Sequence, residues 1–134
     1  MKALTLTQPW ASLVALGHKR VETRSWSTNY RGPLAIHAAK GFPASARNFA
    51  SQECALGRLS VISPLPLGAI IATAQLVDVQ LTQDAALVIS GLERHLGDYS
   101  RGRFAWFLDD VKALDEWILA KGALGLWEWE QIAP

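Results

Sequence analysis

The longest β-like segment of the sequence follows Gly68 and ends at Val79, and its residues are Ala-Ile-Ile-Ala-Thr-Ala-Gln-Leu-Val-Asp-Val. The first of these residues are apolar on both faces of a strand, a pattern that indicates a strand covered on both sides. We therefore expect a central strand and a sheet that supplies its neighbours. Further strands are predicted over 2–6, 21–26, 34–39, 104–108 and 124–130.

Helices are predicted between these strands. Thr7 can cap a first helix that holds Pro9 in its first turn, and Gly17 suits a left-handed C-terminal cap. Trp10 shares a face of this helix with Leu13 and Val14, so we expect it in the core in preference to a role as a ligand platform. Later helices are predicted over 43–56, 82–89 and 110–121, and a polar connector over 91–103.

The helix over 110–121 is suggested by four apolar residues on one helical face: Val111, Leu114, Trp117 and Ile118. Short strands with helices between them predict a small, mainly antiparallel α+β fold, and closure of the strands into a β-barrel would remove exposed edges. The length of 134 residues is that of one domain, which we expect to cover 1–134.

No stretch approaches the roughly 20 apolar residues that span a bilayer, and the N-terminus lacks a secretory pattern. The lone cysteine, Cys54, excludes an internal disulfide and a paired-cysteine zinc site. These features predict a protein of the reducing cytoplasm that has no membrane contact, no metal and no cofactor.

Residues 17–26 carry five ionisable side chains within ten positions. If the second half of this charged segment is a strand, Glu22 and Arg24 project from one face and Thr23 from the other. Lys19 precedes the strand, on the turn after the first helix. The ammonium, carboxylate and guanidinium groups therefore converge, either as a solvated ion-pair cluster or as a site for an anionic or polar ligand.

Aromatic and basic residues near the charged segment are further candidates for a binding site. Trp26 or Tyr30 offers a face on which an unpaired base can stack, and Arg31 and Lys40 add positive charge. Residues 1–60 hold eight Lys/Arg against two Asp/Glu, whereas residues 61–134 hold five against ten. This asymmetry suggests a basic surface that faces an anion such as nucleic acid, unless the two halves mix in the fold.

His37 lies in the strand predicted over 34–39, on the face opposite Leu34 and Ile36. Two interpretations stay open. His37 is either a hydrogen-bonded histidine near the core or a titratable group in the same pocket as Lys19.

Three runs of residues carry a recognisable pattern: Gln8-Pro9-Trp10-Ala11-Ser12-Leu13, Gly17-x-Lys19-x-x-Glu22-x-Arg24-Ser25-Trp26, and Arg31-Gly32-x-Leu34-x-Ile36-His37-Ala38. They resemble the ASCH domain (activating signal cointegrator homology), a family of the PUA-like superfamily. The later segments 104–108 and 122–127 resemble the C-terminal strands of that family. The resemblance implies a small PUA-like β-barrel flanked by helices, a cleft beside the charged segment, and work on RNA or nucleotides.

Three roles follow from this resemblance. A non-enzymatic nucleic-acid-binding module would use basic side chains for phosphates, namely Lys19, Arg24, Arg31 and Lys40, and Trp26 or Tyr30 for stacking. A metal-independent ribonuclease acting on single-stranded RNA would use Glu22 or His37 to move protons. In that enzyme Lys19 and Arg24 would stabilise the phosphorane.

An amidohydrolase acting on N4-acetylcytidine is the third role, and the small hydrolases of this kind carry Lys-x-x-Thr at the motif. Here Glu22 occupies the threonine position, and Thr23 comes one residue later, on the opposite strand face. We therefore predict an RNA- or nucleotide-binding domain with a cleft centred on Lys19, Glu22 and Arg24. RNA cleavage is favoured over deacetylation as its chemistry, and the sequence specifies no oligomeric state.

Overall fold

The computed structural model describes residues 1–60 and 64–130. The strands are β1 (Lys2–Leu6), β2 (Val21–Arg24), β3 (Gly32–Ala38), β4 (Ala69–Leu81), β5 (Phe104–Leu119) and β6 (Leu126–Glu128). The helices are α1 (Trp10–Ala15), α2 (Ala44–Ala55), α3 (Thr82–Ala85) and α4 (Gly91–His95).

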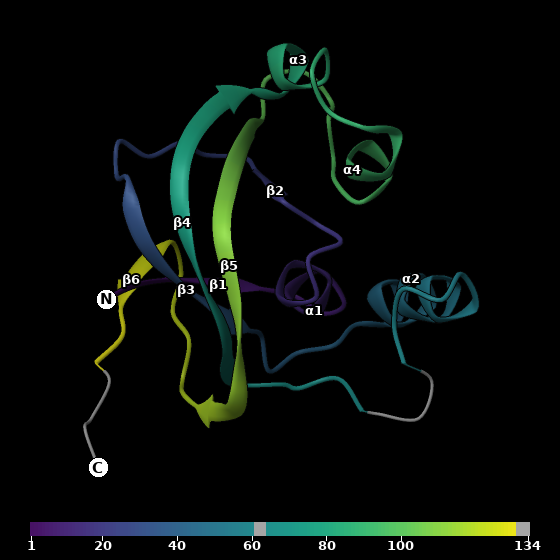
Figure 1. Cartoon of the computed structure of the whole chain (residues 1–134), viewed down its shortest axis with the longest axis vertical. Helices are drawn as coiled ribbons and strands as arrows, with labels where there is room; N and C mark the ends of the chain where they lie inside the picture. Colours follow the sequence, from purple (N-terminus) through teal and green to yellow (C-terminus); the bar gives the residue numbers. More distant parts are fainter. Residues whose placement is uncertain (61–63, 131–134) are drawn as a thin grey trace.

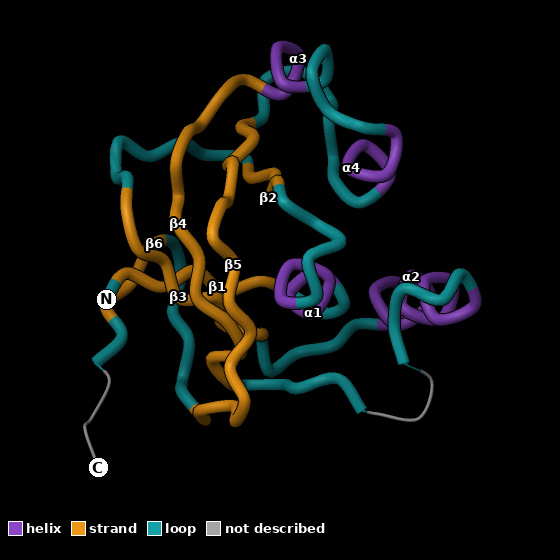
Figure 2. Tube along the Cα trace, viewed as in Figure 1, coloured by secondary structure: helices purple, strands orange, loops and turns teal. Residues whose placement is uncertain are grey.

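All of these strands belong to one sheet, in the order β2-β5-β4-β3-β1-β6. β1 and β3 run parallel, and the other neighbouring strands are antiparallel. The sheet curls into a half-barrel with β2 and β6 at its edges, and α1, α2 and α4 lie together on one side of it (Figures 1 and 2). The predicted α+β class is confirmed, and the sheet is an open half-barrel.

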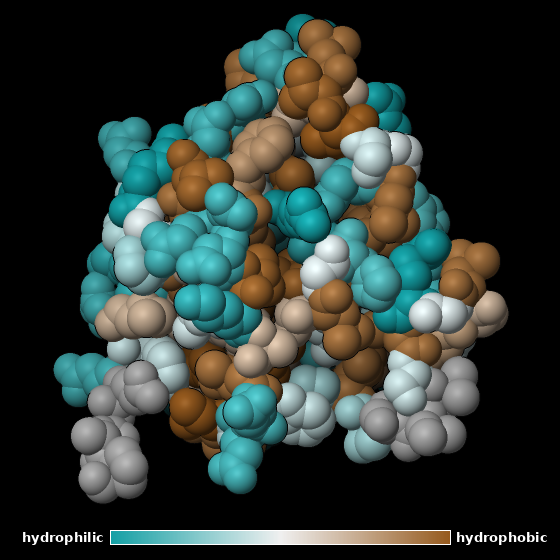
Figure 3. Space-filling model, in the orientation of Figure 1, coloured by the Kyte–Doolittle hydropathy of each residue, from teal (hydrophilic) through white to brown (hydrophobic). Residues whose placement is uncertain are grey.

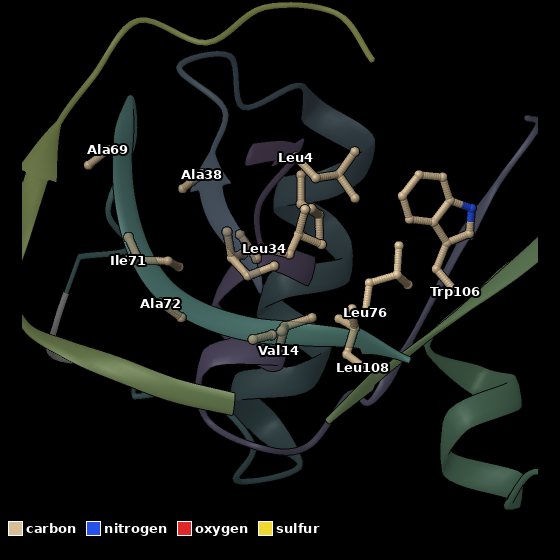
Figure 4. Packing of buried hydrophobic residues seen from close by; sticks show 14 residues of the cluster. Leu4, Val14, Leu34, Ala38, Ala69, Ile71, Ala72, Leu76, Trp106 and Leu108 are labelled. Atoms are coloured by element: carbon tan, nitrogen blue, oxygen red, sulfur yellow. The ribbon is translucent and has the colours of Figure 1, made fainter. Parts of the chain in front are cut away.

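β4 is a central strand, as its apolar run predicts. It lies between β3 and β5, and its first residues, Ala69 to Ala72, are at most 2% exposed. Apolar side chains from the sheet and α1 pack into one cluster around this strand (Figure 4). Trp106 of β5 is the largest fully buried side chain of that cluster, and its indole Nε1 donates a hydrogen bond to the Trp26 carbonyl at 3.2 Å.

The prediction of a helix over 110–121 is wrong, because β5 continues through these residues to Leu119. They pair with the start of β4, where Ile118 lies opposite Ile70 and Lys112 opposite Thr73. The β4–β5 ladder shifts register at three points, and Asp110 has a φ of 48°. Such irregularities break the two-residue alternation by which a strand is recognised in a sequence. The helical spacing of the four apolar residues in this segment therefore led to a wrong prediction.

α1 is fastened to the rest of the fold by the fully buried side chain of Gln8. Its Oε1 accepts a hydrogen bond from the Ser12 backbone N–H at 3.0 Å, and its Nε2 donates to the Ser12 hydroxyl and to the Pro66 carbonyl. One side chain thus satisfies a free N–H in the first turn of the helix and holds the distant segment around Pro66 against it.

The connector predicted over 91–103 contains a short helix, α4. Ser90 caps it, accepting a hydrogen bond from the Glu93 N–H at 3.2 Å. The buried Glu93 carboxylate in turn accepts hydrogen bonds from the backbone N–H groups of Arg20 and Val21. α4 is therefore docked onto the start of β2. The polar residues of this segment cap α4 and dock it onto β2. Because they resemble the polar residues of a loop, the helix was not predicted from the sequence.

Polar and apolar residues are interspersed over the face seen in the space-filling view, and hydrophobic side chains gather over α3 and the segment after it (Figure 3). Leu87 and Val88 in that segment are 84% and 72% exposed. Among the described residues, no helix has the length and apolar character that crossing a membrane requires.

Candidate functional site

A pocket of about 400 Å³ opens between α1, β2, α2 and the end of α4. It is lined by residues from five separate segments: Thr7, Trp10, Glu22, Thr23, Arg24, Phe49, His95, Leu96, Gly97 and Asp98. Its volume lies within the range of small-molecule and cofactor sites, about 300–1,000 Å³. The charged segment therefore does border a pocket, which we call the β2 pocket.

Lys19 does not reach the surface of the β2 pocket. Its side chain is fully buried, and its Nζ donates hydrogen bonds to the carbonyls of Val21, at 2.7 Å, and Leu96, at 2.9 Å. The third neighbour of Nζ is Glu22 Oε1, at 3.6 Å. Two of the three donors of the ammonium therefore bind carbonyls, and its charge is paired with the Glu22 carboxylate. Lys19 thus holds β2 and α4 together, and it has no face to offer a phosphate.

Glu22 is the carboxylate at the centre of the charged segment. Its side chain is 10% exposed and lies between two cations, with Lys19 near Oε1 and Arg24 Nη1 at 3.2 Å from Oε2. Oε1 also accepts a hydrogen bond from the Thr23 N–H. A nearly buried carboxylate with two cationic partners is compensated in charge. Because it lines the β2 pocket, it can also accept a hydrogen bond from a ligand.

Arg24 is the cation of the charged segment that lines the β2 pocket, with a side chain 23% exposed. Both hydrogen bonds of its guanidinium within the described residues use Nη1, which donates to the Thr5 carbonyl and to Glu22. Its Cζ lies 5.7 Å from the centre of the Trp26 ring, and Trp26 packs edge-on against Trp106. Thr5, Glu22 and Trp26 thus orient the Arg24 guanidinium, and within the described residues its Nη2 and Nε donate no hydrogen bond.

Thr23 also lines the β2 pocket, although strand alternation predicts it on the face opposite Glu22. Its Oγ1 accepts a hydrogen bond from the Asp98 N–H at 3.0 Å, so the segment after α4 bends over the strand. A Cβ on Gly97 would lie 3.2 Å from Thr23 Cγ2 and 2.8 Å from the Tyr99 ring. The pocket therefore wraps around the end of β2, and residues of both faces reach it.

A row of three rings forms the other wall of the β2 pocket. Trp10 of α1 stacks on Phe49 of α2 with ring centres 5.2 Å apart, and Phe49 lies 5.5 Å from the His95 ring. All three line the pocket. The prediction that Trp10 belongs to the core is therefore wrong, because the residue is only partly buried and lines the pocket. Phe49 and His95 were not predicted, since neither lies in a recognisable motif.

Two groups in the segment after α4 have a perturbed pKa. Hydrogen bonds from the Ser100 hydroxyl and N–H, with Arg103 nearby, hold the pKa of Asp98 below its usual value. Burial raises the pKa of Tyr99, and the carboxylates of Glu93 and Glu22 raise it further. Asp98 is therefore a fixed negative charge and Tyr99 a neutral phenol over the physiological range.

His37 lies in a different cavity from the charged segment. The residue is 2% exposed; its Nε2 donates to the Ala120 carbonyl at 2.7 Å, and its Nδ1 is hydrogen-bonded to the Thr5 hydroxyl at 3.1 Å. It borders a groove of about 1,020 Å³ formed with the segment 119–124. The prediction that His37 shares a pocket with Lys19 is thus not met. The ring is a hydrogen-bonded histidine near the core, the other interpretation of the sequence.

The tight approach of Gly122 to His37 leads to a stability prediction. A Cβ at Gly122 would lie 2.7 Å from His37 Cε1 and 2.8 Å from Thr5 Oγ1. Gly122→Ala is therefore expected to lower the free energy of unfolding by about 1–2 kcal/mol, measured by urea denaturation. Gly41→Ala is the control, because a Cβ at Gly41 meets nothing within 4 Å. Equal stability of the two variants would contradict this packing.

The remaining predicted contacts are dispersed over the molecule. The Tyr30 hydroxyl donates to the Pro33 carbonyl, and Arg31 donates to the carbonyls of Thr28 and Tyr30. Lys40 borders the groove beside His37. None of these lines the β2 pocket, so their contact with RNA stays a prediction. Several basic residues of the first half are also paired with carboxylates: Lys2 with Glu128, Lys19 and Arg24 with Glu22, and Arg58 with Glu53.

Within residues 1–60 and 64–130, no three His, Cys, Asp or Glu side chains converge as they would around a metal ion.

The curled, six-stranded mixed sheet with helices on one side defines a PUA-like α+β fold. The fold resembles the crystal structure of ASCH from Zymomonas mobilis, with a TM-score of 0.53 over 88% of this chain and 72% of that one, at 15% sequence identity. The ASCH domain model matches residues 4–117. The chain belongs to the ASCH family, whose domains are RNA-binding members of the PUA-like class.

Two curated relatives share short, well-matched stretches with this chain. Activating signal cointegrator 1 of Homo sapiens is 55% identical over 40 residues, and that of Mus musculus is 60% identical over 35 residues. These stretches cover 30% and 26% of this chain, but only 7% and 6% of the two relatives.

Proposed function

We propose that this chain binds single-stranded RNA, with one unpaired nucleotide held in the β2 pocket. The observation that carries the proposal is the presence of a partly uncovered Trp10–Phe49 stack and the oriented guanidinium of Arg24 in one pocket. An aromatic face stacks on a base, and a guanidinium forms paired hydrogen bonds with a phosphate. A base in a duplex is already stacked on its neighbours, so the pocket suits an unpaired base.

The charges at the pocket favour recognition of a nucleotide over tracking of a long backbone. Glu22 and Asp98 border it together with Arg24, so the site has no large excess of positive charge. Their carboxylates can accept hydrogen bonds from base N–H groups or from ribose hydroxyls. We therefore expect one or two phosphate contacts and a shallow salt dependence, with a slope of log K against log [salt] of about −0.7 to −1.4.

Ribonuclease activity is the second candidate, and the position of Glu22 favours it. A carboxylate that borders the same pocket as Arg24 can take a proton from a 2′-hydroxyl while the guanidinium stabilises the phosphorane. Deacetylation of N4-acetylcytidine has less support. Its nucleophile would be Thr23 activated by Lys19, yet the Lys19 Nζ already donates to two carbonyls and pairs with Glu22. A non-enzymatic binding module requires only the stacking and phosphate contacts.

The proposal predicts that Arg24→Gln weakens RNA binding roughly 5–10-fold, as expected for the loss of one charge-assisted contact of about 1–1.5 kcal/mol. The measurement is fluorescence anisotropy of a labelled, unstructured RNA 10-mer at several salt concentrations. The salt slope should become less steep by about 0.7. Arg101→Gln is the matched control, because Arg101 is exposed and does not line the pocket.

Two results would overturn the proposal. One is an absence of binding by the wild-type chain at protein concentrations well above the micromolar range. The other is an equal loss of affinity in Arg24→Gln and Arg101→Gln, which would indicate a diffuse electrostatic contact without a pocket.

A further inference from the structure

His95 borders the β2 pocket and is backed by a buried carboxylate. Its side chain is 44% exposed, its ring packs beside Phe49, and its Nε2 lies 3.4 Å from Oε1 of Glu53. Glu53 belongs to α2 and is fully buried. The Nε2 of His95 therefore lies within ion-pair distance of a buried carboxylate, and the partly exposed side chain lines the β2 pocket.

Glu53 itself is held in place by Arg58. The Arg58 Nε lies 3.2 Å from Oε1 and 3.1 Å from Oε2 of Glu53, and Nη2 lies 2.8 Å from Oε2. A buried carboxylate requires such partners to stay charged. The guanidinium supplies them and fixes the carboxylate plane, so Oε1 remains directed toward His95.

The backbone beside His95 is fixed by the same lysine that holds Glu22. Lys19 binds the carbonyl of Leu96, the residue after His95, and pairs with the Glu22 carboxylate. Lys19 thus links the backbone next to His95 to the Glu22 carboxylate, and both His95 and Glu22 line the β2 pocket. Arg24 and Asp98 are the other charged groups that border the pocket.

We propose that His95 is a proton-transfer residue of this pocket for cleavage of single-stranded RNA, and that Glu53 is its positioning residue. This inference rests on the proposed binding of RNA in the β2 pocket. An imidazole oriented by a carboxylate through one nitrogen can exchange a proton through the other. The histidine that the family motif contains, His37, is buried against Ala120 and Thr5 and cannot serve this pocket.

The reaction is an internal phosphoryl transfer in which all atoms come from the RNA. The 2′-hydroxyl loses its proton to one pocket group, and its oxygen forms a bond to the adjacent phosphorus. The bond from phosphorus to the 5′-oxygen of the next nucleotide breaks, and that oxygen receives a proton. Glu22 and His95 are the two groups that take and give these protons. The products are a 2′,3′-cyclic phosphate end and a free 5′-hydroxyl end.

The alternative is that the Glu53 ion pairs only fasten α4 to α2. The two roles predict different results in a double-mutant cycle, measured as single-turnover cleavage of an unstructured, end-labelled RNA with cyclic-phosphate ends as the product. We expect His95→Ala to lower the rate roughly 100-fold while RNA affinity changes far less. Added imidazole should restore part of the rate. His18→Ala is the control, since His18 lines neither the β2 pocket nor the groove beside His37.

Glu53→Gln should lower the rate roughly 10-fold in the wild-type background and have no further effect in His95→Ala. An equal loss in both backgrounds would indicate a purely structural role and overturn the proposal. Cleavage that is insensitive to His95→Ala would also overturn it, and would point to a contaminating nuclease. RNA binding without cleavage overturns this inference and leaves the binding proposal intact. An absence of RNA binding overturns the binding proposal itself.

Discussion

Lys19→Met is expected to lower the free energy of unfolding by about 3–5 kcal/mol, because it removes one partner of a buried ion pair. Lys19 is fully buried, and Glu22 beside it is 10% exposed. The methionine fills a similar volume but leaves the carbonyls of Val21 and Leu96 without their donor. The change is measured by urea denaturation with linear extrapolation.

Lys40→Met is the matched control for this experiment. Lys40 is exposed, and its substitution should change the free energy of unfolding by less than about 0.5 kcal/mol. Unchanged stability in Lys19→Met together with lost RNA affinity would show that Lys19 is a ligand contact after all. A loss of stability in Lys19→Met that is not seen in Lys40→Met supports a structural role for Lys19.

Trp10→Ala is expected to weaken RNA binding by about 1–3 kcal/mol, or roughly 5–150-fold, because it removes the stacking face of the β2 pocket. Trp10→Phe keeps an aromatic face and should retain most of the affinity. The measurement is anisotropy with an unstructured RNA 10-mer, at a temperature where each variant is folded by circular dichroism.

Trp117→Ala is the control for Trp10→Ala, because it removes an indole outside the β2 pocket. Trp117 lies on β5, is 54% exposed and does not line the pocket. Its substitution should leave RNA affinity unchanged within about twofold. If Trp117→Ala and Trp10→Ala weakened binding equally, the bound strand would lie over the sheet and outside the β2 pocket.

The two cations that pair with Glu22 differ in burial: Lys19 is fully buried, and Arg24 is 23% exposed. Lys19 lies beneath Glu22, and Arg24 lies at the solvent side of the same carboxylate. The three formal charges therefore do not add up to a strongly positive site, because the carboxylate is shared between two cations. What reaches a ligand is one oriented guanidinium and part of one carboxylate. That combination suits recognition of a single nucleotide better than attraction to a long phosphate backbone.

Elements with regular local patterns were predicted well from the sequence. β4 was identified as a central strand by its apolar run. α1 ends before Gly17, whose φ of 84° is left-handed as expected, but Thr7 does not cap the helix, because the N-cap position is Pro9 and has no side-chain cap hydrogen bond. α2 begins after Pro43, as predicted.

The segment 110–121 was not predicted as a strand, because bulges and the positive φ of Asp110 disturb its alternation. Its conformation is decided by pairing with the start of β4, whose partners lie 39 to 50 positions further along the chain, from Thr73–Lys112 to Ala69–Leu119. Tertiary pairing of this kind overrides local preference.

The sequence by itself determined the α+β class, the order of most elements and membership of the ASCH family, because periodicity, turn residues and motif spacing are local properties of the chain. Only the tertiary structure decided that Lys19 is buried, that His37 lies in another cavity, and that Trp10 meets Phe49 and His95 at the β2 pocket. The physical reason is that burial depends on what packs against a residue. Leu96, which closes over Lys19, lies 77 positions along the chain.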